Sequence, residues 1–414
     1  MNDKKYFYIM IFSLVLLLVL GVSYAWFNAV IKGNDTAKEQ KVVTGNLELT
    51  FTDDTEVTLP NAVPGDSYTK TISVKNTGTL DAKYNLVWQE LTNEITNDEL
   101  VIEATCKRLN SSNTEEGTCE SISQTPIKSN TIKRNISIEP SVTHEYTIKV
   151  TFIDTGSLQD YNKKKSFNGK LGIEEYKAPD FATDSWATII ANVKAGNGSE
   201  YAVGSTKEVN LGSTYGTHTL RVANTSTPSE CSTEGFSQSA CGFVLEFADI
   251  ITTHTMNDTD TNVGGWPASG MHTFVNNDIY NSLPSELKMA IIDTVTVSGH
   301  GSTSGETNFT STDKLYLLST AEVWAQGSSN TIDYDVARDN TRQLDYYKNL
   351  GVTTSNYSEA NKKNGTSDSS WSSWWLRAAT SNYTYRFFHV NPNGSWRSDG
   401  AVFSYGLSPA FRIG

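Results

Sequence analysis

The sequence contains few charged side chains and few of the residues that build catalytic or metal sites. Of its 414 residues 19% are charged, and only 6 are histidine and 4 cysteine. It has no H-E-x-x-H zinc motif, no C-x-x-C pair and no G-x-S-x-G nucleophile turn. The formal charge of −13 gives no support to a basic face for nucleic acid, and acidity of this kind keeps a protein soluble. We therefore predict a protein that is not an enzyme, needs no cofactor and has no nucleic-acid partner.

An apolar N-terminal segment predicts export. Two lysines precede an uncharged, mostly apolar run from Tyr6 to Val22. Small residues then form a signal-peptidase site, with cleavage expected between Ala25 and Trp26. The apolar run is also just long enough to span a bilayer. Residues 1–25 are therefore either a signal peptide or a retained membrane anchor, and in both cases the rest of the chain lies outside the cytoplasm.

The four cysteines form two local pairs, one in each half of the exported chain. Because an exported chain meets an oxidising compartment, we predict the disulfides Cys106–Cys119 and Cys231–Cys241. Each disulfide closes a short loop and is worth about 2–3 kcal/mol on the loop-entropy model. The alternative is two pairs of free thiols, because many surface proteins of Gram-positive bacteria avoid disulfides.

Residues 26–177 alternate between apolar and polar side chains, as half-buried strands do. Turn residues, such as those of Val63–Asp66, separate the alternating segments. Short strands with turns between them favour an antiparallel β-sandwich. The clearest strand segments are 45–51, 68–74, 83–88, 144–152 and 169–173.

This half of the chain resembles a known family in "SYAWFNAV", "TGNLELTF", "VPGDSYTKTISVKNTGTLDAKYNLVW" and "GKLGIEEY". These four segments, in this order, are similar to segments of the TasA/camelysin family of Gram-positive biofilm-matrix proteins. The resemblance implies a jelly-roll-like sandwich over residues 26–177 that assembles into extracellular fibres. In such fibres the N-terminal segment of one subunit, here Trp26 to Val43, completes the sheet of the next. The alternative is that this segment pairs within its own sheet.

Some members of that family carry a peptidase label, which implies a metallopeptidase as a further candidate function. His144 is the only histidine in this half of the chain, and no zinc-binding pair accompanies it. The residues therefore give the peptidase label no support.

Residues 178–414 follow a short linker at Tyr176–Asp180 and mix helix and strand signals. The helix signals are an apolar helical spacing from Trp186 to Val193, Pro284 in a first turn, and a capping box from Ser319 to Glu322. The mixture favours an α+β domain. Strand-like segments are 201–204, 207–211, 218–224 and 314–318.

This half resembles a second family in "GGWPASGMHTFVNNDIYNSLPSELKMAI", "TDKLYLLSTAEVW", "WWLRAA", "FFHVNPNGSW" and "YGLSPAFRIG". They are similar to an uncharacterised domain family of Firmicute surface and phage-linked proteins. Its W-W-L-R…F-x-V…G…P-A-F pattern is similar to the core of C-type-lectin-like folds, which include the variable receptors of diversity-generating retroelements. The resemblance implies a lectin-like α+β domain that binds a ligand. Members usually have arginine at the positions of Ser408 and His272, so an arginine-dependent site does not carry over.

The C-terminal segment from Trp374 onward has the pattern of a β-meander, with turns expected at 391–394 and 398–400. Successive side chains of a strand point to opposite faces, so Trp374 and Trp375 are not expected to face the same core. Burying one aromatic ring contributes about 4–6 kcal/mol, and most aromatic residues here are therefore expected to be core.

Several residues of this tail are polar-tipped or amphipathic and lie near its turns. Tyrosine, tryptophan, asparagine and arginine on a rigid frame are typical of binding surfaces. We therefore predict a surface that binds an unknown protein or glycan, with core packing as the alternative. Its residues are Tyr383, Tyr385, Arg386, His389, Asn391, Asn393, Trp396, Arg397 and Tyr405.

A weaker pattern is a calcium loop with oxygen donors at Asp258, Asp260 and Asn262. The glycine of this pattern comes one place late, and Ser269 stands where a bidentate glutamate belongs. The alternative is a solvated polar loop, and we predict no metal ion.

These features together predict an exported protein of the cell surface or extracellular matrix. The N-terminal sandwich would tether or assemble it, with the membrane as a partner if the leader is retained. The C-terminal lectin-like domain would bind a ligand. The alternatives are a structural fibre subunit of a biofilm-like matrix without a ligand and a metallopeptidase of camelysin type.

Overall fold

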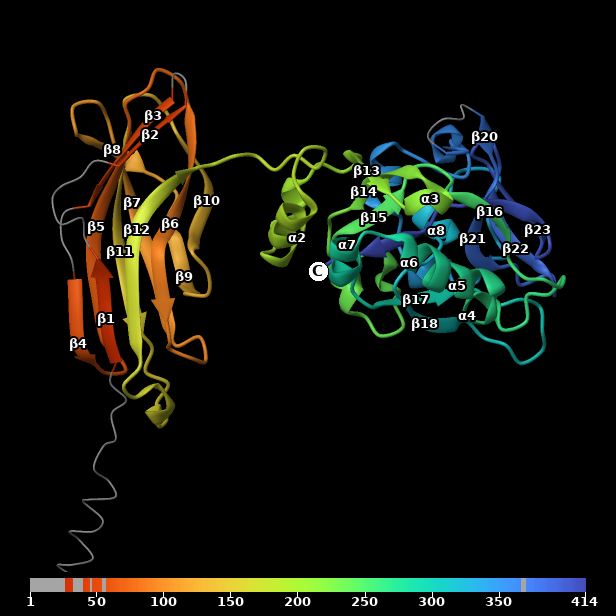
Figure 1. The fold of residues 1–414 in the computed structure, drawn as a ribbon, viewed down its shortest axis with the longest axis horizontal. Helices are drawn as coiled ribbons and strands as arrows, with labels where there is room; N and C mark the ends of the chain where they lie inside the picture. The colour runs from red at the N-terminus through yellow and green to blue at the C-terminus, as the bar shows by residue number, and fades with distance from the viewer. Residues whose placement is uncertain (1–26, 33–39, 45–46, 54–56, 366–369) are drawn as a thin grey trace, which may run out of the picture. The chain divides into compact units, whose positions relative to one another are not determined.

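The computed structural model divides into two compact units, one ending at Lys177 and the other beginning at Ala178. It describes residues 27–32, 40–44, 47–53, 57–365 and 370–414 (Figure 1). The division falls within the segment that the sequence marks as a linker. Ala25 and Trp26, on either side of the expected cleavage site, lie outside the described residues. Within those ranges, no helix combines the length and apolar character that crossing a membrane requires.

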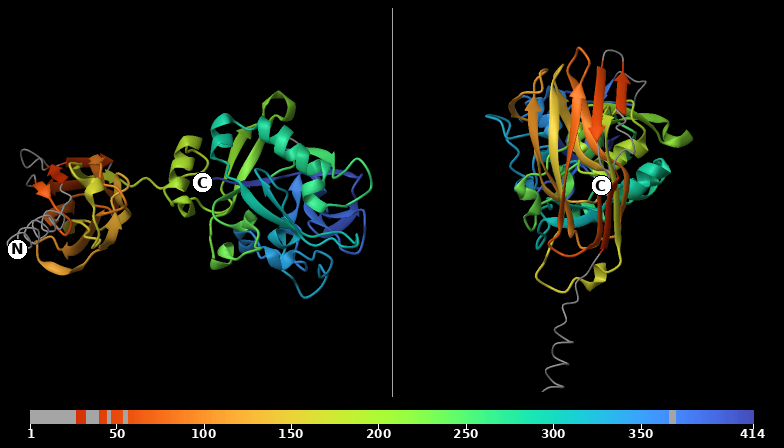
Figure 2. Two further views of the ribbon diagram at one scale, coloured as in Figure 1. Left: turned by 90° about the horizontal axis from the view of Figure 1, so that it is seen from below. Right: turned by 90° about the vertical axis from the view of Figure 1, so that its left-hand side faces the viewer.

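Two β-sheets form the N-terminal unit. One has the strand order β10-β6-β12-β1-β4 and the other β2-β3-β5-β11-β7-β8, with β9 also paired to β7. Figure 2 shows that the strands of this unit run along a common long direction. Their bounds are β1 Phe27–Lys32, β2 Gln40–Thr44, β3 Leu47–Asp53, β4 Val57–Ala62, β5 Ser67–Asn76, β6 Ala82–Asn93, β7 Leu100–Leu109, β8 Glu115–Thr118, β9 Ile122–Pro126, β10 Thr131–Ile138, β11 Thr143–Phe152 and β12 Ser166–Glu175.

The apolar face of each sheet contributes to one shared core. Tyr146, Ile148 and Val150 of β11 are buried, and β6 of the other sheet supplies Tyr84 and Trp88 to the same cluster. This alternation is the pattern from which the strands were expected, and the structure contains a strand at each of the five expected segments. The prediction of a β-rich, largely antiparallel unit is confirmed.

The segment expected to act as a donor strand pairs within its own chain. β1 lies between β12, to which it is parallel, and β4, to which it is antiparallel. β2 pairs with β3 in the other sheet. This is the second of the two arrangements that the sequence left open.

The C-terminal unit contains several small sheets with short helices around them. The larger sheets have the orders β13-β14-β15-β25 and β16-β24-β21-β22-β23, and β17-β18 and β19-β20 are two-stranded. The strand bounds are β13 Thr206–Asn210, β14 Thr217–Asn224, β15 Val244–Phe247, β16 Thr252–Thr255, β17 Thr294–Ser298, β18 Phe309–Asp313, β19 Lys362–Lys363, β20 Trp371–Ser372, β21 Trp374–Ala379, β22 Arg386–Val390, β23 Trp396–Gly400, β24 Ser404–Leu407 and β25 Ala410–Arg412. The helix bounds are α2 Trp186–Lys194, α3 Gly212–Tyr215, α4 Gly265–Ala268, α5 Gly270–Phe274, α6 Tyr280–Ser282, α7 Ser285–Ala290, α8 Thr320–Val323 and α9 Asp345–Asn349, and a π-helical turn, Val275–Ile279, joins α5 to α6.

The helix signals of this half are confirmed at their N-termini. The Ser185 hydroxyl accepts a hydrogen bond from the backbone amide of Thr188, in the first turn of α2, at 3.1 Å. The capping box formed by Ser319 and Glu322 starts α8. Pro284 was expected within a first turn, but it is the N-cap residue immediately before α7.

Two of the expected strands are absent from this unit. Residues 201–204 form a turn that ends at Gly204, whose φ of +93° does not suit an extended strand. Residues 315–318 are buried, but the segment 314–318 pairs only at Tyr316, with Ala410. The carbonyl oxygen of Leu317 accepts a hydrogen bond from the Arg377 side chain at 2.8 Å, where a strand would pair with a neighbouring strand.

The expectation that Trp374 and Trp375 would not share a core is wrong. Both belong to the same hydrophobic cluster and both are 0% exposed. β21 is the central strand of its sheet, and both of its faces are covered. The Trp374 indole donates to the Ala360 carbonyl at 3.2 Å, and the Trp375 indole donates to the His254 carbonyl at 3.0 Å.

The tail is a meander only as far as β23. The expected turn at 391–394 is present, but β23 continues through residues 398–400, where a second turn was expected. Asp399 pairs with Phe387 and Gly400 with Arg386, and these ladder positions keep the segment extended. The chain turns at 401–403, and β24 then returns to pair in parallel with β21.

Candidate functional site

Tyr383, Tyr385 and Arg386 form a half-buried aromatic–guanidinium cluster at the start of β22. The Arg386 guanidinium lies 4.3 Å from the centre of the Tyr383 ring and 5.4 Å from that of Tyr385. The two rings are 5.5 Å apart and nearly perpendicular. Contacts of this type are cation–π interactions, and they fix the three side chains as one unit at the edge of the domain.

His389 is buried at 1% exposure and is not part of an open surface. Its Nε2 lies 3.2 Å from Oδ1 of Asn391, and its ring packs 5.7 Å from Trp375 and 4.6 Å from Tyr405. Burial lowers the pKa of His389 to about 4, and the Asp399 carboxylate offsets this only in part. Burial and a 2.7 Å hydrogen bond donated to Asp399 raise the pKa of Tyr405 to about 12. Both side chains are therefore neutral at pH 7 and held by their neighbours.

The two asparagines of the tail shape the turn between β22 and β23. Oδ1 of Asn393 accepts from the Ser395 backbone at 3.1 Å and from its hydroxyl at 2.8 Å, and the Asn391 amide donates to the same hydroxyl at 3.1 Å. Gly394 has a φ of +87°, and a Cβ there would lie 2.0 Å from the carbonyl oxygen of Tyr357. The two asparagines therefore stabilise this turn, and position 394 within it requires glycine.

The predicted tail residues do not lie on one surface. In the register of β22 and β23, His389 is opposite Arg397 and Val390 is opposite Trp396, so the two pairs face opposite sides of the sheet. Trp396 packs 5.9 Å from the Phe388 ring, and Arg397 is exposed. The structure assembles two small groups, around Arg386 and around His389, and no single tail surface built from all nine residues.

The residues of the weak calcium pattern have different surroundings. Asp258 and Asp260 are exposed, whereas Asn262 is fully buried. The Asn262 amide donates to the carbonyl oxygens of Tyr383 and Arg386, both at 3.0 Å. Asn262 therefore holds the backbone at the start of β22.

A pocket of about 480 Å³ lies elsewhere in the C-terminal unit, between β13, β14, α9 and β20. Its lining combines aromatic faces with carboxylate, amide and amine groups. Trp371 at its rim is 47% exposed, and the Lys363 amine lies 5.3 Å from the centre of its ring. The lining residues are Glu208, Thr219, Arg221, Ala248, Asp249, Tyr346, Glu359, Asn361, Lys363, Gly365 and Trp371.

A buried charge network supports the floor of this pocket. Glu246, 0% exposed, accepts from Arg221 at 2.7 Å, from Lys362 at 2.7 Å and from the Tyr347 hydroxyl at 3.0 Å. Burial raises the pKa of Glu246, but the two cations outweigh it and the pKa lies below its usual value. The Arg221 guanidinium stacks 3.6 Å from the Tyr346 ring centre, which places a fixed cation and a fixed aromatic face side by side at the pocket.

Sequence reasoning missed this pocket because its residues are far apart in the chain and follow no spacing rule. Glu208, Asp249 and Trp371 come from three separate segments, and none of them stands in a recognisable motif. The one local signal was the pair of exposed aromatic and basic residues at Trp371 and Lys363, which becomes meaningful only when β19 and β20 pair.

Ser408 and His272, the two positions at which the resemblance implied arginine, each make hydrogen bonds within the C-terminal unit. Ser408 accepts from the Lys362 amine at 2.7 Å and donates to the Phe247 carbonyl at 2.7 Å. Nε2 of His272 lies 2.8 Å from Oδ1 of Asp313. Both positions are therefore structural in this chain.

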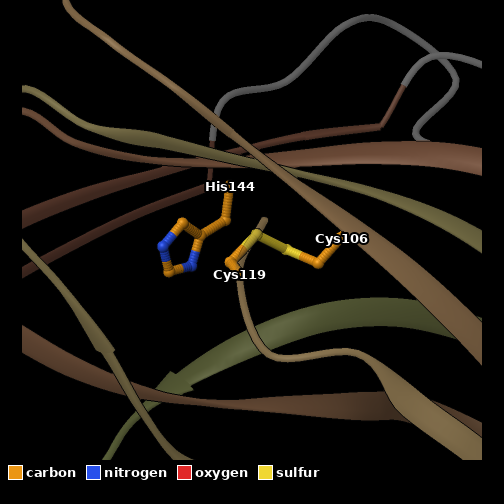
Figure 3. Close-up of side chains that lie close together, drawn as sticks. All are labelled: Cys106, Cys119 and His144. Atoms are coloured by element: carbon orange, nitrogen blue, oxygen red, sulfur yellow. A yellow bond between two sulfur atoms is a disulfide. The ribbon is translucent and has the colours of Figure 1, made fainter. Parts of the chain in front are cut away.

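In the N-terminal unit Cys106, Cys119 and His144 come together inside the two-sheet core (Figure 3). Cys106 lies on β7, Cys119 follows β8, and His144 lies on β11, and one ligand atom from each lies within 4.8 Å of the others. Among the described residues this is the group of histidine, cysteine and carboxylate side chains with the geometry to hold a metal ion. The two cysteines are joined as a disulfide, as are Cys231 and Cys241, so both pairings expected from the sequence are present.

His144 is neutral in this environment. Its Nδ1 lies 3.0 Å from the Tyr84 hydroxyl, which in turn lies 2.9 Å from the Tyr146 hydroxyl. Burial, together with the charge of Arg108, lowers the pKa of His144 to about 4, and the carboxylate of Glu139 opposes this only in part. With both sulfurs in a disulfide, however, the group has no thiolate, so in its oxidised form this group does not suit a metal ion.

Two family models match the chain, one in each unit. Residues 4–90 match the family described as camelysin metallo-endopeptidase. Residues 243–414 match a domain of unknown function (DUF6273). No curated protein matches the chain. The N-terminal part of the chain is therefore camelysin-like, which suggests a protein of the cell surface or extracellular space, and the C-terminal part is similar to a family without an assigned function.

Proposed function

We propose that the chain is an exported, non-enzymatic protein of the cell surface or extracellular matrix that binds a glycan through its C-terminal unit. The N-terminal unit, which we interpret as a jelly-roll-like sandwich, would tether or assemble the protein. The C-terminal unit, which we interpret as lectin-like, would supply the binding site. The camelysin-like match and the two disulfides support the location, and the pocket at Trp371 supports the binding role.

The chemistry of the pocket favours a sugar over an apolar ligand. Ligand sites combine aromatic side chains with a few placed polar groups that fix the orientation. Here the aromatic faces are Trp371 and Tyr346, and Glu208, Glu359 and Asn361 offer hydrogen-bond acceptors and a donor at the rim. Glu208 and Glu359 are exposed, so their carboxylates are accessible to hydroxyl groups of a ligand.

The test is binding of the full-length chain to a glycan array, followed by calorimetric titration with the best glycan and with a purified cell-wall disaccharide-peptide. We expect Trp371→Ala to weaken binding roughly 10–30-fold, because exposed tryptophans at ligand sites are frequent hot spots. Phe403→Ala is the matched control, because Phe403 is 52% exposed and lies outside the pocket. The proposal fails if no glycan binds, or if both variants bind as the parent chain does.

A fibre subunit without a ligand is the second candidate, and the edge strands of the N-terminal sheets motivate it. In this alternative the N-terminal units would add to one another through edge strands, of which β4 ends one sheet. Electron microscopy of the purified chain tests it. Filaments would support assembly, and protein that stays monomeric at high concentration would rule it out.

We propose that the chain is not an enzyme, although the family that matches residues 4–90 is described as a metallo-endopeptidase. The test is hydrolysis of an unstructured protein substrate by the purified chain, with and without a metal chelator. Cleavage that the chelator abolishes would contradict our proposal and would favour a metallopeptidase.

A further inference from the structure

The sulfur atoms of Cys106 and Cys119 and a ring nitrogen of His144 meet at one point of the N-terminal unit. His144 is 4% exposed and Cys106 2% exposed, while Cys119 is half-buried. The backbone amide of Cys119 donates to the carbonyl oxygen of Cys106 at 3.3 Å, so the two residues stay adjacent whether or not their sulfurs are bonded. The site therefore depends on the sheet and not on the disulfide alone.

We propose that reduction of the Cys106–Cys119 disulfide converts this group into a binding site for a borderline-soft divalent cation such as Zn²⁺, with His144 as the third ligand. Thiolate and imidazole are the ligands that Zn²⁺ prefers, with metal–sulfur distances of about 2.3 Å and metal–nitrogen distances of about 2.0–2.1 Å. Ligand atoms within 4.8 Å of one another can surround such an ion after small side-chain rotations. Metal ion and disulfide would be two mutually exclusive ways of joining the same strands.

The reaction balances with a dithiol as the reductant. The dithiol transfers two electrons and two protons to the disulfide, becomes a disulfide itself, and leaves two cysteine thiols. Binding of one Zn²⁺ then releases two protons as the thiols become thiolates. An external disulfide can accept the two electrons by thiol–disulfide exchange and, with two protons from water, become two thiols. The Cys106–Cys119 disulfide then forms again and the ion is released, so the binding of metal reports the redox state.

The surroundings of His144 resemble those of a metal ligand held in place. The hydroxyl of Tyr84 lies 3.0 Å from Nδ1 and restrains the ring, and Tyr146 restrains Tyr84 in turn. In Figure 3 the ring nitrogen on the side of the sulfur atoms is the one bonded to Cγ, Nδ1, so the hydrogen bond from Tyr84 holds the ring in place and a bound ion would replace it. Cys119 is followed at once by Glu120, and their segment leads from the edge strand β8, so one ligand can adjust while the other two stay fixed in β7 and β11.

The experiment is titration of the tag-free full-length chain with Co²⁺ and Zn²⁺, before and after reduction by a phosphine. Cys231→Ser/Cys241→Ser is the parent, so that only one cysteine pair is reduced. We expect one Co²⁺ per reduced chain, with a thiolate-to-cobalt charge-transfer band that Zn²⁺ removes, and no such band in the oxidised chain. A reduced chain without the band overturns the proposal.

The third ligand is tested by His144→Gln, with His218→Gln as the matched control from the other unit, where His218 is 4% exposed and bonds Asp249. We expect the first change to weaken Co²⁺ binding by at least the roughly 10–100-fold that loss of an outer-shell partner costs, and the second to leave it unchanged. Equal affinity for both variants contradicts the role of His144.

A measurement on the unmodified chain covers the case in which a variant does not fold. Zn²⁺ should slow alkylation of Cys106 and Cys119 in the reduced wild-type chain at least 10-fold, as read by peptide mass mapping, and should leave Cys231 and Cys241 unprotected. Equal alkylation rates with and without Zn²⁺ would overturn the proposal. The metal site lies in the N-terminal unit and the proposed glycan pocket in the C-terminal unit. The metal experiments and the glycan experiments can therefore fail separately.

Discussion

Arg377 and Glu322 form a buried ion pair at the centre of the C-terminal unit. Both side chains are 0% exposed, and the guanidinium donates to the carboxylate at 2.5 and 2.6 Å and to the carbonyl oxygens of Val297 and Leu317. Burial raises the pKa of Glu322, but Arg377 outweighs it and keeps the carboxylate ionised. The pair joins α8, β17 and β21, three elements that are distant in the chain.

We expect Arg377→Met to destabilise the C-terminal unit by about 3–5 kcal/mol, because it leaves the Glu322 charge buried without its partner. The control is Arg397→Met, at an exposed arginine, which should cost less than about 0.5 kcal/mol. Urea unfolding measures both values. Equal costs for the two variants would show that the buried pair contributes no more than a surface charge does.

His389 makes the stability of the same unit depend on pH. Its folded pKa of about 4 lies below the usual value of 6.5, so the unfolded chain takes up a proton first as the pH falls. The stability that comes from keeping His389 neutral is present in full above pH 6.5 and is lost as the pH falls from 6.5 to 4. We expect a loss of about 2 kcal/mol between pH 7 and pH 5. His389→Phe should remove this part of the pH dependence, and an unchanged slope in that variant would contradict the assignment.

At the level of single residues, the sequence predicted contacts correctly only where the partners lie close together in the chain and their residue types favour a bond. The disulfides are confirmed because each cysteine pair is close in sequence and the compartment favours oxidation. The tail was expected to be one binding surface because its residue types suit binding, but residue type does not reveal which face of a sheet a side chain takes. His389 is buried for that reason, and the charge network around Glu246 depends on pairings between strands that no local pattern encodes.

At the level of elements, β21 shows where strand patterns lose information. A strand with one buried face alternates between apolar and polar residues, and strands such as β5 and β11 could therefore be located from the sequence. A central strand with both faces covered loses this alternation, and all six residues of Trp374–Ala379 are buried, including the charged Arg377. The rule that neighbours face opposite sides still holds for Trp374 and Trp375, but both sides are core.

This arrangement predicts equal and large costs for the two tryptophans. We expect Trp374→Ala and Trp375→Ala each to lower the free energy of unfolding of the C-terminal unit by about 3–5 kcal/mol, because each leaves a large cavity. Trp371→Ala, at an exposed ring, should cost less than about 1 kcal/mol. Chemical denaturation gives the three values. A small cost for only one of the two neighbours would mean that one face of β21 is open.

At the level of the whole molecule, each unit has the features of an independent folding unit. Each contains its own hydrophobic cluster, centred on Trp88 in one and on Trp374 in the other, and its own disulfide. Units with separate cores and separate covalent cross-links need not unfold together, and a single unfolding temperature would then not describe the chain.

We therefore expect two transitions in scanning calorimetry of the full-length chain, and each should respond to changes in its own core alone. Trp88→Ala should lower the transition of the N-terminal unit by roughly 10 °C and leave the other in place, because a cavity of about 3–5 kcal/mol shifts the unfolding temperature of a domain of this size by roughly 2–4 °C per kcal/mol. Trp374→Ala should do the reverse. If either variant moves both transitions together, the two units do not unfold independently.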